Sequence, residues 1–276
     1  MLWLVLRIAI LVYLGLVLLL VLAQSYLVYH PIRSIGVRPD QCGMPCETVS
    51  FQTSDGVKLS AWFIPTRGAK GTLLLCHGNS GNISYDIDTC GIFQRLGFSV
   101  LAFDYRGYGE SEGSPSERGT YRDVEAAWDY LVNDRKIPPG QILVLGRSLG
   151  GPIAAWVARE HTPGALILES TFSSVADAAN TGPFRAFPVR LLCRFGYRTA
   201  EYVRQVKCPV LVIHSPEDEI VRFELGRRLF EAANEPKEFL EISGTHNEGF
   251  ILSGPRYVDG LRAFISNHFR GNGDSQ

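Results

Sequence analysis

Apolar residues fill the first part of the chain almost without interruption. The segment 1–23 carries a single charge, Arg7. The run from 8 to 28 would form roughly 31 Å of helix at about 1.5 Å per residue, which matches the hydrocarbon core of a bilayer. Tyr26, Tyr29 and His30 follow where an interfacial aromatic belt is expected. The pattern predicts a single-pass transmembrane anchor over 1–29.

A cleaved signal peptide is the competing interpretation of this segment, with a candidate cleavage site after Ala23. The apolar run is longer than the usual hydrophobic region of a signal peptide and continues past that site, which favours an uncleaved anchor. Orientation stays open, because Arg7 lies on one side of the run and Arg33 and Arg38 on the other. The side of the membrane that holds the rest of the chain is therefore not predicted.

After Pro31, short apolar runs alternate with segments of helical periodicity. Strands are expected at 47–53, 57–65, 71–76, 98–103, 141–145, 165–168, 209–213 and 237–242, and helices at 85–96, 116–133, 149–159, 224–233 and 255–269. Strands that are apolar throughout are typical of a parallel sheet covered by helices on both faces. A Ser-Asp-Gly turn at 54–56 predicts an antiparallel hairpin between the first two strands. We therefore predict an α/β fold with a mixed, mostly parallel sheet of about eight strands.

The domain organisation follows from the length and from one long connection. A chain of 276 residues accommodates one large domain and a short appendage. We assign 30–46 to a linker and 47–270 to the folded domain, with a disordered tail at 271–276. Segment 171–207 separates two strands by more than a single crossover requires, and it is rich in proline and phenylalanine. It predicts a small, partly helical cap over the carboxyl edge of the sheet.

Composition excludes some classes of partner and cofactor. The formal net charge is -1, with 27 basic and 28 acidic residues, so we expect no nucleic-acid partner. The six cysteines are irregularly spaced and have no partnering His or Cys pair, so we expect no metal site and no cofactor. Cys42 and Cys46 could form a disulfide on an oxidising side of the membrane. The oligomeric state is not predicted.

The pattern G-x-S-x-G occurs twice, around Ser111 and around Ser148. In a nucleophile elbow the serine must follow a strand and open a helix, in a turn so tight that its neighbours need minimal side chains. Ser148 lies between the expected strand 141–145 and the expected helix 149–159. Ser111 lies among Gly, Tyr, Glu and Pro residues typical of a loop, and its neighbours Glu110 and Glu112 disfavour an adjacent oxyanion. We predict that Ser148 is the nucleophile and that Ser111 is structural.

Partners for Ser148 follow in the order serine, acid, histidine that such an elbow predicts. Asp218 comes shortly after the strand 209–213, and His246 lies in the loop after the strand 237–242. Glu217 is the second choice for the acid, because the shorter aspartate in a tight turn suits an imidazole partner better. In this arrangement His246 removes the Ser148 proton and Asp218 orients the imidazole.

An oxyanion hole requires two backbone N–H groups near the nucleophile. One is expected from Leu149, the residue after Ser148. The other is expected from the loop that follows the strand 71–76, with Asn79 as the first choice and Ser80 next. His77, directly at the end of that strand, is interpreted as a structural residue that organises the loop.

Three motifs together resemble the α/β-hydrolase superfamily over about 47–269. They are His-Gly-Asn-Ser-Gly-Asn at 77–82, Asp-Tyr-Arg-Gly-Tyr-Gly at 104–109 and Gly-Arg-Ser-Leu-Gly-Gly at 146–151. They are similar to the membrane-anchored serine hydrolase branch, which includes acyl-protein thioesterases and lysophospholipid lipases. That resemblance implies acyl-ester, thioester or lipid-like substrates at a membrane. The branch often carries a glycine just before the acid, where this chain has Glu217.

The expected function is therefore hydrolysis of a carboxylic ester or thioester near a bilayer. A peptidase is the first alternative, since the same motifs resemble the catalytic domain of prolyl-oligopeptidase-like enzymes, although the chain has no room for their propeller. A non-catalytic, membrane-tethered interaction protein is the second, and the presence of all three triad residues speaks against it.

Overall fold

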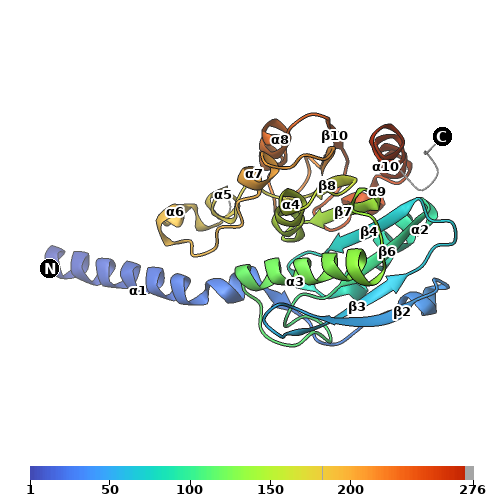
Figure 1. Ribbon diagram of the computed structural model, residues 1–276. Coiled ribbons are helices and arrows are strands. Elements are labelled where there is room, and N and C mark those ends of the chain that lie inside the picture. The colour runs from blue at the N-terminus through green and yellow to red at the C-terminus, as the bar shows by residue number, and fades with distance from the viewer. Residues whose placement is uncertain (182, 271–276) are drawn as a thin grey trace.

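The computed structural model describes residues 1–181 and 183–270; the expected tail 271–276 lies outside the described residues. Its centre is a sheet of eight strands (Figure 1). They are β2 (Glu47–Gln52), β3 (Lys58–Ile64), β4 (Gly71–Cys76), β6 (Phe98–Phe103), β7 (Ile142–Arg147), β8 (Ala165–Glu169), β9 (Val210–His214) and β10 (Lys237–Glu241). The strand order is β10-β9-β8-β7-β4-β6-β3-β2; within this described sheet β3 pairs antiparallel with both β2 and β6, and the other neighbouring strands pair in parallel. The predicted mixed, mostly parallel sheet is confirmed.

Burial along the strands explains their composition. Every residue of β4, β6, β8 and β9 is buried, because each of these strands has helices on both faces. The edge strand β2 instead alternates between exposed and partly buried residues, as its Glu-Thr-Val-Ser-Phe-Gln sequence suggests. The apolar runs were therefore a direct signal of the central strands.

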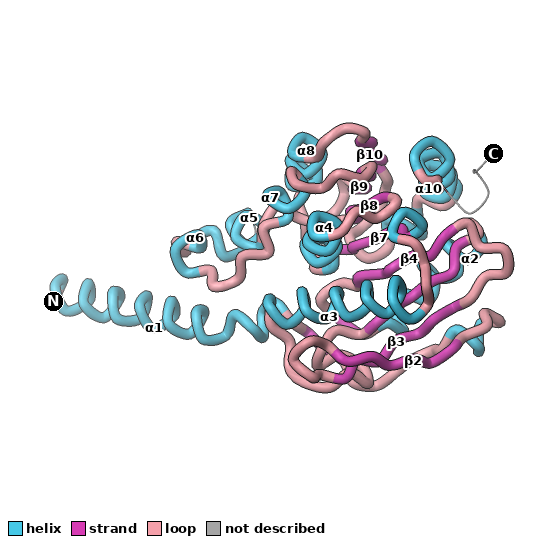
Figure 2. The backbone as a smooth tube through the Cα atoms, viewed as in Figure 1, coloured by secondary structure: helices cyan, strands magenta, loops and turns pink. Residues whose placement is uncertain are grey.

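Helices form one layer on each face of the sheet (Figure 2). α3 (Glu117–Asp129), α4 (Gly150–Glu160), α7 (Thr199–Val203) and α8 (Phe223–Ala232) cover one face, and α2 (Ile87–Arg95) and α10 (Pro255–His268) cover the other. The Ser116 side chain accepts a hydrogen bond from the Gly119 N–H and so caps α3. The helix expected at 116–133 is right in extent, but its last turn, Tyr130–Asp134, is a π-helix closed by the Arg135 N–H on the Tyr130 carbonyl.

The segment between β8 and β9 holds short helices that lie at the carboxyl edge of the sheet (Figure 1). They are α5 (Val175–Thr181), the 3-10 turn Pro183–Ala186 and α6 (Val189–Leu192), followed by α7. We use the name cap for residues 174–196. α7 packs instead against α4 and α8 and is part of the helical layer.

The N-terminal helix α1 (Leu2–Val28) projects from the domain alongside the cap (Figure 1). Its length and apolar composition are sufficient to cross a membrane. Immediately after it, β1 (His30–Pro31) pairs in parallel with β5 (Ser80–Gly81). The following stretch contains the 3-10 helix Pro39–Cys42, and Cys42 and Cys46 are both free thiols. After α1 the chain thus pairs with a loop at the carboxyl end of β4.

Candidate active site

Ser148 lies in a sharp turn between β7 and α4. Its φ is 51°, in the left-handed region that non-glycine residues rarely adopt. The Ser148 N–H donates to the Glu169 carbonyl (3.0 Å), and the Thr171 hydroxyl donates to the Ser148 carbonyl (2.6 Å). Strain held by flanking contacts in this way is characteristic of a functional serine at an elbow.

The glycines of the motif are explained by close backbone approach. A β-carbon at Gly150 would clash with the carbonyl oxygen of Cys76 in the neighbouring strand β4. One at Gly146 would meet the Gly150 carbonyl and the side chain of Ala154 on α4. Both clashes involve atoms that cannot move without displacing a strand or a helix. The turn therefore requires glycine at both positions, two residues to either side of Ser148.

The structure brings the three predicted residues together in one hydrogen-bonded chain. His246 Nε2 is 3.1 Å from Ser148 Oγ, and His246 Nδ1 is 2.8 Å from Asp218 Oδ2. An ionised carboxylate can only accept, so Nδ1 carries the proton and donates to Asp218. Nε2 is then left to accept the Ser148 hydroxyl proton. This is the tautomer that a serine nucleophile needs.

Asp218 is held in its ionised form. Burial acts to raise its pKa, but hydrogen bonds from His214 and His246 and from the Val221 N–H outweigh burial and leave the pKa well below its usual range. Its other oxygen, Oδ1, accepts the backbone N–H groups of Ile220 (3.0 Å) and Val221 (2.7 Å). The carboxylate is thus fixed in orientation and charged at neutral pH.

The acidic neighbours of Asp218 hold the histidine loop. The Glu217 carboxylate accepts the Gly244 N–H (3.0 Å), and the Glu219 carboxylate accepts the His246 N–H (3.1 Å). Glu217, the second choice for the acid, therefore contacts the backbone of that loop while Asp218 contacts the imidazole. The supporting role of the two glutamates was not predicted, because sequence order does not show which way neighbouring side chains in a turn point.

Asn79 and Leu149 both line the cavity that contains Ser148. Among the described residues, the backbone N–H of neither one donates a hydrogen bond to the protein. The Asn79 carbonyl accepts the His30 N–H (2.9 Å) and the Tyr108 hydroxyl (2.8 Å), which holds the peptide between Asn79 and Ser80. A β-carbon at Gly78 would be 3.8 Å from the Ser148 β-carbon, an ordinary contact, so the expected need for glycine at this position does not come from packing.

His77 and Ser111 are both buried outside that cavity. The His77 ring packs on Tyr105 with centroids 4.1 Å apart, and Nδ1 bonds the Gly78 carbonyl at 2.8 Å. Burial lowers its pKa to about 4, so the ring is neutral. The Ser111 hydroxyl donates to the Asp104 carbonyl (2.7 Å) and accepts the Ser60 N–H (2.9 Å). The side chains of His77 and Ser111 thus each form hydrogen bonds with backbone groups and have a structural role.

A buried ion-pair network that sequence reasoning missed lies behind the elbow. Arg147 contacts Glu169 (2.8 Å), Asp86 (3.0 Å) and the Thr89 hydroxyl (2.9 Å), and the Tyr257 hydroxyl donates to Glu169 at 2.6 Å. The arginine occupies a variable position of the G-x-S-x-G pattern, so the motif gave no signal for it. Its partners bind β7 to β8 and α10 directly beside Ser148.

Two hollows lie near the cap, and chemistry distinguishes them. The one that contains Ser148 and His246 has a volume of about 430 Å³. Its apolar lining comes from the cap, the loop after Asp218 and α1: Leu27, Val28, Phe172, Val175, Ala178, Ala179, Phe184, Phe187, Val189, Leu192, Phe195, Ile220 and Val221. The larger hollow, about 690 Å³, is lined by arginines and carboxylates and contains none of the three residues of the hydrogen-bonded chain. Within the described residues, no group of three or more His, Cys, Asp or Glu side chains could hold a metal ion.

Comparison with known proteins identifies the family. The profile described as "alpha/beta hydrolase fold" matches residues 71–212. The chain belongs to the α/β-hydrolase family. The α/β hydrolase domain-containing protein WAV2 of Arabidopsis thaliana is 34% identical over 267 residues, with 87% of this chain and 86% of the relative covered. A Saccharomyces cerevisiae protein named as a membrane protein is 35% identical over 259 residues, with 88% of each covered.

A solved structure shares the hydrolase fold at a lower level of sequence similarity. The Pyrococcus furiosus esterase Pf2001 superposes with a TM-score of 0.75 at 20% identity, covering 88% of this chain and 98% of the esterase. The predicted superfamily and its fold are confirmed.

Proposed function

We propose that this α/β-hydrolase is a serine hydrolase that cleaves a carboxylic ester or thioester through an acyl-enzyme on Ser148. The proposal rests on one observation above all. The Ser148–His246–Asp218 chain, with contacts of 3.1 and 2.8 Å, opens into an apolar cavity.

The residues divide the chemistry in the following way. His246 takes the hydroxyl proton as Ser148 Oγ attacks the acyl carbon, and the charged Asp218 stabilises the imidazolium. The N–H groups of Asn79 and Leu149 donate to the developing oxyanion. When the intermediate collapses, the bond to the alcohol or thiol breaks, and the leaving group takes the proton from His246. Water, deprotonated by the same histidine, then releases the acid and restores Ser148.

The cavity lining favours an acyl substrate. Within the described part of the chain it includes no Asp, Glu, Lys or Arg side chain, so it offers no charged partner to a peptide side chain. Its volume lies within the range of about 300–1,000 Å³ that is usual for small-molecule sites. Burial of a hydrocarbon chain there would gain roughly 0.8 kcal/mol per methylene.

The same proposal places the enzyme at a membrane. α1 would be a single-pass anchor, residues 30–46 the linker and 47–270 the catalytic domain, with 171–207 as its predicted cap segment. Support comes from the length and apolarity of α1 and from the yeast relative named as a membrane protein.

Labelling with a fluorophosphonate probe tests the nucleophile. The full chain in detergent should be labelled, and Ser148→Ala should lose labelling entirely, because the probe reacts only with an activated serine. Ser111→Ala is the matched control, since Ser111 has the same local motif but is buried outside the cavity; it should retain labelling.

Two results would contradict the proposal. Labelling that persists in Ser148→Ala would place the reactive group elsewhere. A folded wild type that is not labelled at all would show that Ser148 is not activated.

A further inference from the structure

The anchor helix makes specific contacts with the cap. The Gln24 side chain donates to the Leu192 carbonyl (2.7 Å) and accepts the Arg194 N–H (2.7 Å). An amide in an otherwise apolar membrane segment is costly unless its polar atoms are paired. Here both ends of the amide are paired with cap backbone, so the cost of placing Gln24 in α1 is offset by attachment of the cap.

One side of the carboxyl-terminal half of α1 faces the cap. Val17, Leu20, Val21, Gln24 and Val28 are partly buried and recur at intervals of three or four residues, as one face of a helix does. Residues of the opposite face, such as Leu18, Leu19 and Leu22, are exposed. Further toward the N-terminus, Tyr13 stacks on Phe187 of the cap with ring centroids 5.7 Å apart.

These contacts fix the depth of the cap if α1 spans a bilayer. The 27 residues of α1 are about 40 Å long, and the hydrocarbon core is about 30 Å thick. At most about 10 Å of the helix can therefore lie outside the core on the domain side. The hydrocarbon core on that side thus ends at about residue 22 or at a residue closer to the domain. Tyr13 is then about 13 Å or more inside the hydrocarbon, and Phe187 lies at the same level.

One large exposed side chain of the cap suits that surrounding, whereas the exposed Arg185 and Arg190 have to extend toward the headgroups. Leu191, on α6, is 87% exposed and contributes a large apolar side chain to the surface beside the anchor. On its inner side the cap contributes Phe184, Phe187 and Leu192 to the cavity at Ser148. The anchor completes the same cavity with Gln24, Leu27 and Val28. The cavity wall is thus built in part from a membrane helix.

We propose that the cap lies within the leaflet on the domain side, and that the acyl chain of the substrate passes from that leaflet into the cavity between α1 and the cap. The first half rests on the membrane anchor of the proposed function, and the second half rests also on the proposed hydrolysis at Ser148. A lipid-borne acyl chain would then reach Ser148 without crossing water, which would otherwise oppose its transfer by roughly 0.8 kcal/mol per methylene.

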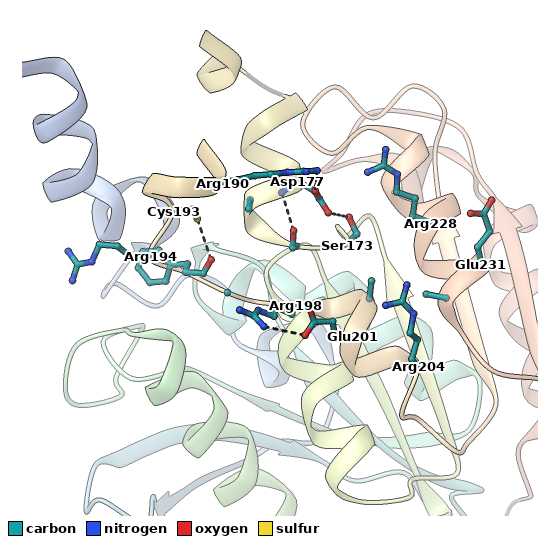
Figure 3. Close-up of a pocket in the computed structure, with 16 residues that line it drawn as sticks. Ser173, Asp177, Arg190, Cys193, Arg194, Arg198, Glu201, Arg204, Arg228 and Glu231 are labelled. Carbon is teal, nitrogen blue, oxygen red and sulfur yellow. Dashed lines mark hydrogen bonds and ion pairs between the residues drawn. The ribbon is translucent and has the colours of Figure 1, made fainter. Parts of the chain in front are cut away.

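The arginine-lined hollow fits the headgroup region of the same arrangement (Figure 3). Five arginines line it, Arg190, Arg194, Arg198, Arg204 and Arg228, together with three carboxylates, Asp177, Glu201 and Glu231. Arg190 runs beside Asp177 and pairs with it at 3.3 Å, while Arg204 and Arg228 come from the α7–α8 side. The hollow lies between the cap and the α7–α8 side of the domain, where lipid phosphates would lie. Long arginine side chains can reach that level from the cap.

The depth of the cap can be measured without any enzyme activity. The full chain carrying Leu191→Trp is reconstituted in phosphatidylcholine vesicles whose acyl chains are brominated, which quenches nearby tryptophan. The emission that the new tryptophan adds to that of wild type is compared between brominated and non-brominated vesicles. We expect most of this added emission to be lost in the brominated vesicles. Ile251→Trp is the control, since Ile251 is also exposed but lies on α9 (Gly249–Leu252), away from the anchor. Its added emission should be retained.

If brominated vesicles quench the added tryptophan to the same extent in both variants, the cap is not immersed in the leaflet. Because this readout does not use Ser148, it stands even if the fluorophosphonate experiment fails.

The passage of the acyl chain is tested at the anchor wall. Leu27→Trp should narrow the cavity, whereas Leu22→Trp alters the opposite face of α1. Hydrolysis rates are measured on a long-chain ester held in vesicles and on a short soluble ester. Each rate is divided by the amount of protein that the fluorophosphonate probe labels at Ser148. For Leu27→Trp the ratio of the long-chain to the short-chain rate should fall about 10-fold, a usual cost of misfit in an apolar pocket. For Leu22→Trp it should equal that of wild type.

A ratio unchanged in Leu27→Trp, or lowered equally in both variants, would overturn the proposed route. Loss of serine labelling in wild type would instead overturn the proposed function, and the depth measurement alone would then judge the placement of the cap.

Discussion

At the scale of single residues, the geometry of the site depends on which atoms of each side chain form hydrogen bonds. Asp218 uses one oxygen for backbone N–H groups and the other for His246, so it cannot rotate away from the imidazole. Glu217 and Glu219 hold the backbone of the histidine loop. The order serine, acid, histidine predicted three residues that the structure joins by hydrogen bonds. The roles of the two glutamates depend on turn geometry, which that order does not contain.

Asp218→Asn should lower kcat by about 10⁴-fold while the fold is kept, because an amide at this position favours the wrong histidine tautomer. Steady-state hydrolysis of a short soluble ester measures the effect. Glu217→Gln removes the same charge one residue away and touches only the Gly244 N–H, so its loss should stay below about 10-fold. Comparable losses in the two variants would mean that charge near the loop, and not the Asp218–His246 hydrogen bond, matters for activity.

At the scale of elements, three segments pack closely at the turn that carries Ser148. β7, α4 and the end of β4 approach so closely that Gly146 and Gly150 leave no space for a β-carbon. The apolar runs that became strands were visible in the sequence, although β7 extends to Arg147, two residues beyond the expected 141–145. The cap helices were not individually predicted, since helices of four to seven residues are too short to establish a period.

Gly150→Ala should destabilise the protein by about 3 kcal/mol or more, because the new methyl group would overlap the Cys76 carbonyl and force β4 and α4 apart. Gly140→Ala offers the comparison, as a β-carbon there meets no atom within 4 Å among the described residues. Thermal unfolding in detergent should show a lowered midpoint for Gly150→Ala and a midpoint close to that of wild type for Gly140→Ala. Similar midpoints for both variants would show that the elbow tolerates a side chain at 150.

At the scale of the whole molecule, distant segments meet at a few buried polar groups. Asp104, at the end of β6, accepts the Ile83 N–H (2.9 Å) through its side chain, and its backbone bonds the Ser60 carbonyl and the Ser111 hydroxyl. Burial raises the pKa of Asp104 to about 7. The neighbouring His77 is neutral above its pKa of about 4 and cannot compensate the charge.

Stability should therefore depend on the ionisation of Asp104. Its pKa is about 7 in the fold against roughly 3.9 in the unfolded chain, so the folded state binds more protons between these values, and its stability falls as pH rises from about 4 to 7. Asp104→Asn keeps an acceptor and carries no charge. Between pH 5 and pH 8, its unfolding midpoint should rise relative to that of wild type. A difference between the two proteins that is constant over this interval would contradict the raised pKa.

The contact between anchor and cap could not be predicted from the sequence, for a reason that also belongs to this scale. A membrane helix is apolar on all sides, so its pattern does not reveal which face is packed. Gln24 is the first polar residue after the apolar run 8–23. It was assigned to the anchor only because the segment has to reach residue 28 to match the thickness of the hydrocarbon core. Its two partners, Leu192 and Arg194, are about 170 residues away in the chain.

The short pairing of β1 with β5 gives the anchor a mechanical connection to the reacting groups. The His30 N–H donates to the carbonyl of Asn79, and so holds the peptide between Asn79 and Ser80, two residues that line the cavity at Ser148. Exchanging α1 for another membrane segment without His30 and Pro31 would release that loop. If α1 spans a bilayer and Ser148 is the nucleophile, as proposed, tilting of α1 in a thinner or thicker bilayer would pull on the same pairing, and turnover should vary with the thickness of the membrane.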